Sequence, residues 1–216
     1  MIISLNKKIA LITGGGTGIG KGIAKALSDA GATVIITSRD KKNINKTLKT
    51  LNNKCVGYKT DLSKSKNIDT LYKNIKKKFR GVDILINNIG HTLNIKNPFA
   101  KISDWKKVMD LNFFTSVDVT NKFIVDMKKK NWGRIINITS IAGIEISGPS
   151  TFNASKAALT AYTRSVGRQL AIEKRNIVMT AVAPGVIPTE NGHWNKTNLN
   201  TKHAKYYLKH RTALGR

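Results

Sequence analysis

Short runs of β-branched residues alternate along the chain with longer segments in which apolar residues recur every three or four positions. The first pattern predicts strands and the second predicts helices. Six strands are expected, at Ile9–Thr13, Thr33–Thr37, Cys55–Tyr58, Asp83–Asn87, Arg134–Thr139 and Ile177–Ala181. The expected helices are Ile19–Ala30, Lys42–Leu51, Ile68–Phe79, Ile102–Lys129 and Ala154–Glu173.

The strand segments carry Ile and Val at consecutive positions rather than at every second one. This pattern is typical of parallel strands that are buried on both faces. Together with the repeated β-then-α order, it predicts a doubly wound, Rossmann-like α/β fold with a six-stranded parallel sheet. No repeat or Pro/Gly-rich linker divides the chain, so residues 1–216 are expected to form one domain.

The composition excludes several other classes of protein. Apolar residues make up 40% of 216 residues, which is ordinary for a globular chain. No segment approaches the roughly 18–20 apolar residues that span a bilayer, and the first residues lack the pattern of a secretory signal. One cysteine, Cys55, allows no internal disulfide, and the four histidines are scattered. A cytoplasmic protein without a membrane segment or a metal site is expected.

The net charge of +26 raises the question of nucleic-acid binding. Of the 38 basic residues only eight are arginine, and lysine is abundant together with asparagine and isoleucine. All three residues have AT-rich codons, and many lysines occupy positions typical of a solvated helix face. We interpret the excess as a solvated surface and expect no nucleic-acid partner, since no nucleic-acid-binding motif accompanies the charge.

A glycine-rich segment, Thr13–Gly20, joins the first strand to the first helix. Glycines allow a sharp turn and a close approach to a pyrophosphate, and the helix N-terminus then offers free N–H groups to the anion. The spacing differs from the general G-x-G-x-x-G fingerprint, and a tight connection without a ligand is the alternative. Arg39 follows the second strand, where an arginine accommodates a 2′-phosphate, so NADP is expected and NAD is less favoured. Asp40 alternatively caps the next helix.

Seven motifs in order resemble the short-chain dehydrogenase/reductase family, in its classical type. They are Thr13–Gly20, Asp61-Leu62, Asn87-Asn88-Ile89-Gly90, Asn112, Asn137–Ser140, Asn153–Ala158 and Pro184-Gly185 running to Thr189. The resemblance extends from about Ile9 to the end of the chain. Within the family, the chain is most similar to 3-oxoacyl-carrier-protein reductases and to sugar or polyol dehydrogenases.

The resemblance implies an oxidoreductase that interconverts a carbonyl and an alcohol of a small-molecule substrate with a nicotinamide cofactor. It implies that Ser140 polarises the substrate oxygen, that Lys156 binds the nicotinamide ribose, and that Asn112 holds a kinked helix and a relay water. Asp61 would bind adenine, and Asn87 with Gly90 would line the adenosine ribose. The cofactor-binding positions expected in all are Gly14, Gly16, Thr17, Gly18, Ile19, Gly20, Arg39, Asp61, Leu62, Asn88, Gly90, Lys156, Pro184, Gly185, Ile187 and Thr189.

The chain departs from the family at its central signature, Tyr-x-x-x-Lys. Counting back from Lys156, the tyrosine position holds Phe152. Phenylalanine keeps the ring and removes the hydroxyl that transfers the proton, a contribution typically worth about 10²–10⁴-fold. Impaired catalysis is therefore expected, with Ser140, a water on Lys156 or His91 as substitute proton sources. The alternative is a catalytically silent protein that binds NADP or a partner on the same scaffold.

Relatives continue beyond Thr212–Arg216 with another helix and a last strand. The sequence thus predicts a C-terminally incomplete domain in which Ile177–Ala181 forms an uncovered edge, which is an aggregation hazard. A shortened gene product and a partner that covers the edge both remain open, and a homodimer or homotetramer is possible. The segment Val186–Leu208 is expected to form the lid over the substrate. Its Asn191-Gly192-His193-Trp194 would suit a sugar or polyol, or ordinary loop packing.

Overall fold

The computed structural model describes residues 4–52, 54–145, 147–190, 192, 194–195 and 199–211. Six strands form one parallel sheet in the order β3-β2-β1-β4-β5-β6. They are β1 (Ile9–Ile12), β2 (Thr33–Ser38), β3 (Val56–Lys59), β4 (Ile84–Asn87), β5 (Gly133–Ile138) and β6 (Ile177–Val182). The fold class expected from the sequence is confirmed.

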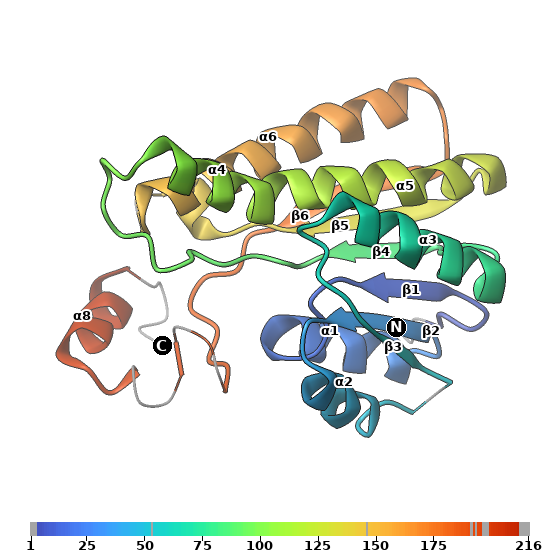
Figure 1. Cartoon of the computed structure of the whole chain (residues 1–216), viewed down its shortest axis with the longest axis horizontal. Helices are drawn as coiled ribbons and strands as arrows, with labels where there is room; N and C mark the ends of the chain where they lie inside the picture. The colour runs from blue at the N-terminus through green and yellow to red at the C-terminus, as the bar shows by residue number, and fades with distance from the viewer. Residues whose placement is uncertain are drawn as a thin grey trace.

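Helices cover both faces of the sheet. The main ones are α1 (Gly18–Asp29), α2 (Lys41–Leu48), α3 (Ser65–Phe79), α4 (Ile102–Met109), α5 (Thr115–Lys130) and α6 (Ser150–Ile172). In Figure 1, α1 and α2 lie on one side of the sheet, and α3, α4, α5 and α6 lie on the other. This is the doubly wound arrangement, in which the carboxyl ends of all strands meet at one edge.

Two hydrophobic clusters explain why the strands carry consecutive apolar residues. Leu11 of β1 packs with Phe123 of α5 and Ile75 of α3 on one face of the sheet. Its neighbour Ile12 packs with Ala24 of α1 on the other face. Successive side chains of a strand point to opposite faces, so a strand buried on both sides needs apolar residues at every position.

The expected helix Ile102–Lys129 is divided by a π-helical turn, η1 (Asp110–Phe114), which joins α4 to α5. The resemblance to the family implied a kinked helix around Asn112, and the π-helical turn lies at this place. An extra residue in one turn widens the helix at this point, and such bulges are frequent at functional sites. Helix α6 begins at Ser150, four residues before the expected start, so Phe152 lies in its first turn.

A short helix, α8 (Lys202–Arg211), lies within the segment that was expected only as a lid. Strand β6 pairs with β5 alone among the described residues, and it leaves Val178 and Val182 44% and 51% exposed. No helix of the described residues is long and apolar enough to cross a membrane.

Candidate functional site

The glycine segment forms a tight turn between β1 and α1. Gly14 and Gly18 have φ of +64° and +55°, in the left-handed region that favours glycine. The amide of Gly14 donates to the Thr37 hydroxyl at 3.2 Å, which ties the turn to the end of β2. A Cβ at Gly20 would lie 2.5 Å from the Gly14 carbonyl oxygen. Only glycine fits there.

Helix α1 begins without a side chain that caps its first amides. Thr17 is the N-cap residue in extended conformation, and its side chain makes no capping hydrogen bond. The N–H groups of the first turn, at Gly18, Ile19 and Gly20, have no partner within the helix. An uncapped helix start beside a glycine cradle is suited to a phosphate group. The residues present therefore fit a dinucleotide's pyrophosphate.

The Asn88 side chain hydrogen-bonds to the backbone of the glycine turn. Its amide nitrogen donates to the carbonyl oxygens of Thr13 and Gly14 at 3.0 and 3.2 Å. The Thr13 hydroxyl in turn accepts from the Asn88 backbone amide at 2.9 Å. Thr13 begins the motif Thr13–Gly20, but it was not among the cofactor-binding positions expected from the sequence.

Asn87 differs from its expected role beside the adenosine ribose. Its side chain is 1% exposed and donates to Thr120 of α5 and Asn137 of β5, at 2.9 and 2.8 Å. Asn137 continues this polar chain to Thr163 of α6. The expectation was wrong because β4 is a central strand, whose last side chain points into the helical layer. Asn137 begins the motif Asn137–Ser140, but its hydrogen bonds in this polar chain, and the parts of Thr120 and Thr163, were not expected from the sequence.

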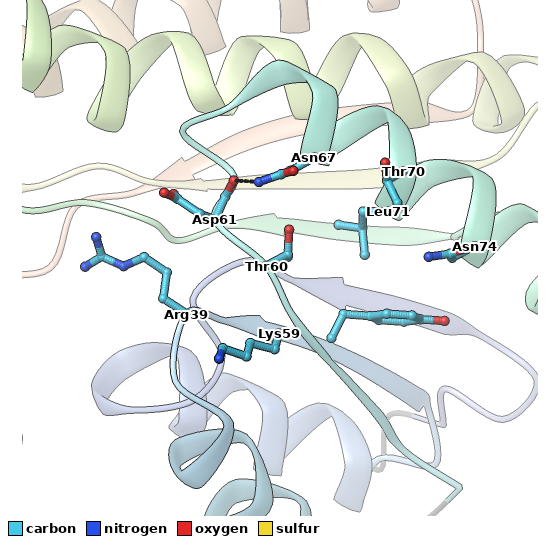
Figure 2. A pocket seen from close by; sticks show the side chains of 9 residues that line it. Arg39, Lys59, Thr60, Asp61, Asn67, Thr70, Leu71 and Asn74 are labelled. Carbon is cyan, nitrogen blue, oxygen red and sulfur yellow. Dashed lines mark hydrogen bonds between the residues drawn. The ribbon is translucent and has the colours of Figure 1, made fainter.

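A cavity of about 520 Å³ lies between the end of β2, strand β3 and helix α3. Arg39 and Asp61 lie at one end of it, and their side chains are near each other (Figure 2). Thr70, Leu71 and Asn74 lie at the other end (Figure 2), and Tyr58 also lines the cavity. Leu62, next to Asp61, is 2% exposed and packs into the core.

The Asp61 carboxylate remains ionised. Partial burial acts to raise its pKa, but hydrogen bonds from the Ser63 hydroxyl and amide and the charges of Arg39 and Lys64 outweigh this, and the pKa is lowered. The Ser63 bonds are 2.8 and 3.2 Å long. A carboxylate and a guanidinium therefore face the same cavity. Asp40 does cap α2, since its carboxylate accepts from the Lys42 amide at 2.7 Å.

Lys156, in α6, lies beside the carboxyl end of β5. Its side chain is buried at 3% exposure, and its ammonium donates to the Ile138 carbonyl oxygen at 2.8 Å. Burial lowers the pKa of Lys156 to about 8. A Cβ at Gly90 would lie 2.9 Å from both Lys156 Nζ and Asn112 Oδ1. The glycine therefore makes room for both groups.

Asn112 sits inside the π-helical turn and is fully buried. Its amide nitrogen donates to the carbonyl oxygens of His91 and Val108 at 2.9 and 2.8 Å, and its oxygen accepts from the His91 amide at 2.9 Å. These bonds fasten the segment after β4 to the widened helix.

Ser140 lies two residues after the end of β5, the strand whose last carbonyl oxygen accepts from Lys156. Its hydroxyl caps the 3-10 turn η2 (Ile141–Gly143) by accepting from the Ala142 amide at 3.1 Å. This turn presses on α6, since a Cβ at Gly143 would lie 2.7 Å from the Lys156 carbonyl carbon. Phe152 lies one turn before Lys156, and the ammonium is 5.7 Å from the centre of its ring.

The segment after β6 contacts both the turn that follows β5 and the glycine turn that follows β1. The Pro184 carbonyl oxygen accepts from the Ile141 amide at 3.2 Å, and Gly185 approaches the Ile141 side chain. Five residues after Pro184, a Thr189 methyl lies 3.5 Å from a Cβ placed on Gly18. Ile187 lies between these two contacts and is 44% exposed. Asn191 and His193, expected in the lid, are outside the described residues.

Comparison with known proteins identifies this arrangement. The family model described as "short chain dehydrogenase" matches residues 8–200. The chain belongs to the short-chain dehydrogenase family. It is thus an enzyme, an oxidoreductase that interconverts carbonyl and alcohol groups with a nicotinamide cofactor.

Relatives of this short-chain dehydrogenase match most or all of its length. It is 33% identical to 3-oxoacyl-[acyl-carrier-protein] reductase FabG of Aquifex aeolicus, over 100% of the chain and 86% of that protein. It is 33% identical to an uncharacterised oxidoreductase of Staphylococcus aureus, over 86% of the chain and 80% of that protein.

Two solved structures have the same fold. The Pseudomonas aeruginosa RhlG/NADP complex superposes with a TM-score of 0.84 at 30% identity, covering 96% of this chain and 82% of RhlG. A 7α-hydroxysteroid dehydrogenase complexed with NADH and 7-oxo glycochenodeoxycholic acid superposes with a TM-score of 0.88 at 27% identity, covering 100% and 83%. The short-chain dehydrogenase family therefore accounts for the whole six-stranded sheet. The described residues contain no cluster of His, Cys, Asp and Glu side chains that could hold a metal ion.

Proposed function

We propose that this short-chain dehydrogenase uses NADP. The observation that carries the proposal is the Arg39 guanidinium, which lines the cavity at the end of β2 and forms no ion pair with a described side chain. A guanidinium in this place can bind a 2′-phosphate through charge-assisted hydrogen bonds. The NADP bound to RhlG supports the same cofactor, whereas the NADH bound to the hydroxysteroid dehydrogenase supports the alternative.

A titration of the wild-type protein with NADPH and with NADH, followed by cofactor fluorescence, tests this proposal. We expect NADPH to bind at least about tenfold more tightly, which corresponds to roughly 1.4 kcal/mol. Equal affinities, or tighter binding of NADH, would contradict it.

We propose that the reacting carbonyl oxygen lies within hydrogen-bond distance of the Ser140 hydroxyl and near the Lys156 ammonium. The reduced nicotinamide, when bound, supplies the hydride that the carbonyl carbon accepts. Ser140 donates a hydrogen bond to the oxygen, and the Lys156 ammonium favours the negative charge that develops there. One proton must reach this oxygen to complete the alcohol.

Phe152 has no acidic hydrogen to supply that proton. We therefore propose that catalysis is slow, with the proton coming from water held near Lys156. The ammonium has three hydrogens, and the Ile138 carbonyl accepts one of them. Ser140 remains a second source. The silent-protein alternative is not favoured, because relatives that match most of the chain are named as reductase and oxidoreductases.

A homo-oligomer is also proposed. Phe114 and Val125 are 52% and 46% exposed, and they are eleven residues, or about three turns, apart along η1 and α5. They thus share one face, which a second copy could cover. Analytical ultracentrifugation of the wild-type protein tests this. A cytoplasmic location is proposed from the sequence alone.

A further inference from the structure

The carboxyl ends of the six parallel strands lie together at one end of the sheet. This end has two chemically different halves. At β2 and β3 it carries charged groups, with Arg39, Lys59 and Asp61 around the cavity. At β4, β5 and β6 the segments that follow the strands carry exposed aliphatic side chains. Leu93, Ile144 and Ile187 are 36%, 72% and 44% exposed.

Each of these three residues is tied to a group proposed for the reaction. The Leu93 amide donates to His91 Nδ1 at 2.8 Å, and the His91 backbone is held by Asn112. Ile144 directly follows the 3-10 turn that Ser140 caps. Ile187 lies three residues after Pro184, which is bonded to that same turn.

Several polar groups of the segments that follow β4 and β6 are already engaged by the protein. Asn112 makes three hydrogen bonds with its amide group. The Nδ1 atom of His91 accepts from Leu93. Trp194 packs against Tyr207 of α8 with 5.2 Å between ring centres, and the Asn195 amide donates to Gly192. A polyhydroxylated substrate would need several polar groups directed at it, and these described residues do not offer them.

We infer that the substrate is an apolar ketone or the matching secondary alcohol, whose hydrocarbon part lies against Leu93, Ile144 and Ile187. The inference rests on the proposed position of the reacting oxygen at Ser140. It favours a hydrocarbon substrate over the sugar or polyol considered from the sequence. Burial of each additional CH₂ group of the ligand should tighten binding about three- to fourfold, the factor that corresponds to about 0.8 kcal/mol.

The test measures binding without catalysis. A ketone and the oxidised cofactor cannot react with each other, so isothermal titration calorimetry of 2-alkanones against the wild-type protein saturated with NADP reports affinity even if the enzyme is slow. We expect the dissociation constant to fall about three- to fourfold per added CH₂, from 2-butanone to 2-octanone. Fructose, a polyhydroxylated ketone, should bind more weakly than 2-hexanone, which has the same number of carbons.

Two variants with one substitution provide a matched comparison. Ile144→Asn should weaken binding of 2-octanone about tenfold, because a polar amide replaces the apolar contact. Ile172→Asn is the control, since Ile172 is 62% exposed at the far end of α6. An equal loss in both variants, no dependence on chain length, tighter binding of fructose, or no binding of any alkanone would overturn the inference.

Failure of the cofactor site is distinguishable from failure of this inference. If neither NADP nor NAD binds, the proposed cofactor function is wrong. The alkanones are then titrated against the protein alone, where a dependence on chain length that Ile144→Asn reduces still supports the apolar site, and its absence refutes it.

Discussion

The ammonium nitrogen of Lys156 lies 5.7 Å from the centre of the Phe152 ring, one helical turn away on α6. The position at which the resemblance to the family implies a phenolic hydroxyl therefore contributes only an aromatic face here. That face attracts the cation weakly at this distance, but it offers no proton. The proposed chemistry of the site depends on this pair.

Restoring the hydroxyl should restore the reaction. We expect Phe152→Tyr to raise the rate of NADPH-dependent ketone reduction about 100- to 10,000-fold, the usual contribution of a positioned general acid. Steady-state kinetics with 2-octanone measures the gain, and cofactor affinity should be unchanged. Phe79→Tyr is the control, because Phe79 is a partly buried residue at the end of α3, away from the site. No gain in Phe152→Tyr would contradict the proposed role of Lys156 and Ser140.

The local sequence predicted those parts of the fold in which one pattern determines the outcome. All six strands were located to within two residues of their observed ends, because consecutive Ile and Val residues are buried on both faces of the sheet. Helix α8 was not expected, since Lys202–Arg211 carries little apolar periodicity.

The site was predictable where a backbone conformation demands one residue type. Gly14 and Gly18 mark the glycine turn because their φ values are positive. The burial of Asn87 was not predictable in the same way. Its direction depends on the central position of β4, which emerges only once the strands are ordered.

Arg39 should determine the choice of cofactor. We expect Arg39→Gln to weaken NADPH binding about 10- to 100-fold, since hydrogen bonds to charged groups contribute about 1.5–3 kcal/mol. NADH, which lacks the 2′-phosphate, should bind as it does to the wild type. Fluorescence titration of both cofactors measures the two affinities. Arg168→Gln, an exposed change on α6, is the control for the loss of one positive charge. A parallel loss of NADH affinity would show that Arg39 acts on folding or on adenine instead.

Burial of Lys156 should make stability depend on pH. Its folded-state pKa is about 8, below the ordinary value of 10.5, so folding favours the neutral amine. The group's contribution is therefore fully favourable above pH 10.5, and it is lost as the pH falls through the window to about 8. The total change is on the order of 3 kcal/mol, at about 1.4 kcal/mol per pH unit.

Comparison with Lys156→Met isolates this effect, because the other lysines titrate in both proteins. Urea unfolding at pH 8 and at pH 10 should show the free energy of unfolding of the wild type rising by more than that of the variant. A difference between the two proteins that stays constant with pH would mean that water reaches the ammonium in the folded state.

Substitutions at two glycines of α1 distinguish the role of the glycine turn from that of the helix. A Cβ at Gly20 would lie 2.5 Å from both the Gly14 carbonyl oxygen and the Asn88 amide nitrogen, whereas a Cβ at Gly22 meets nothing within 4 Å. Gly22→Ala should stabilise the protein by about 0.5–1 kcal/mol, since alanine is the better helix former. Gly20→Ala should destabilise it by about 1–3 kcal/mol through overpacking.

Measuring cofactor affinity then distinguishes an effect on the glycine turn from an effect on the stability of the whole protein. Gly20→Ala displaces the turn that we propose receives the pyrophosphate, so we expect NADPH affinity to fall at least about tenfold at a temperature where the variant is fully folded by circular dichroism. Gly22→Ala should bind NADPH as the wild type does, because its added methyl group points into open space. If Gly20→Ala is folded and binds NADPH normally, the pyrophosphate does not lie at the start of α1.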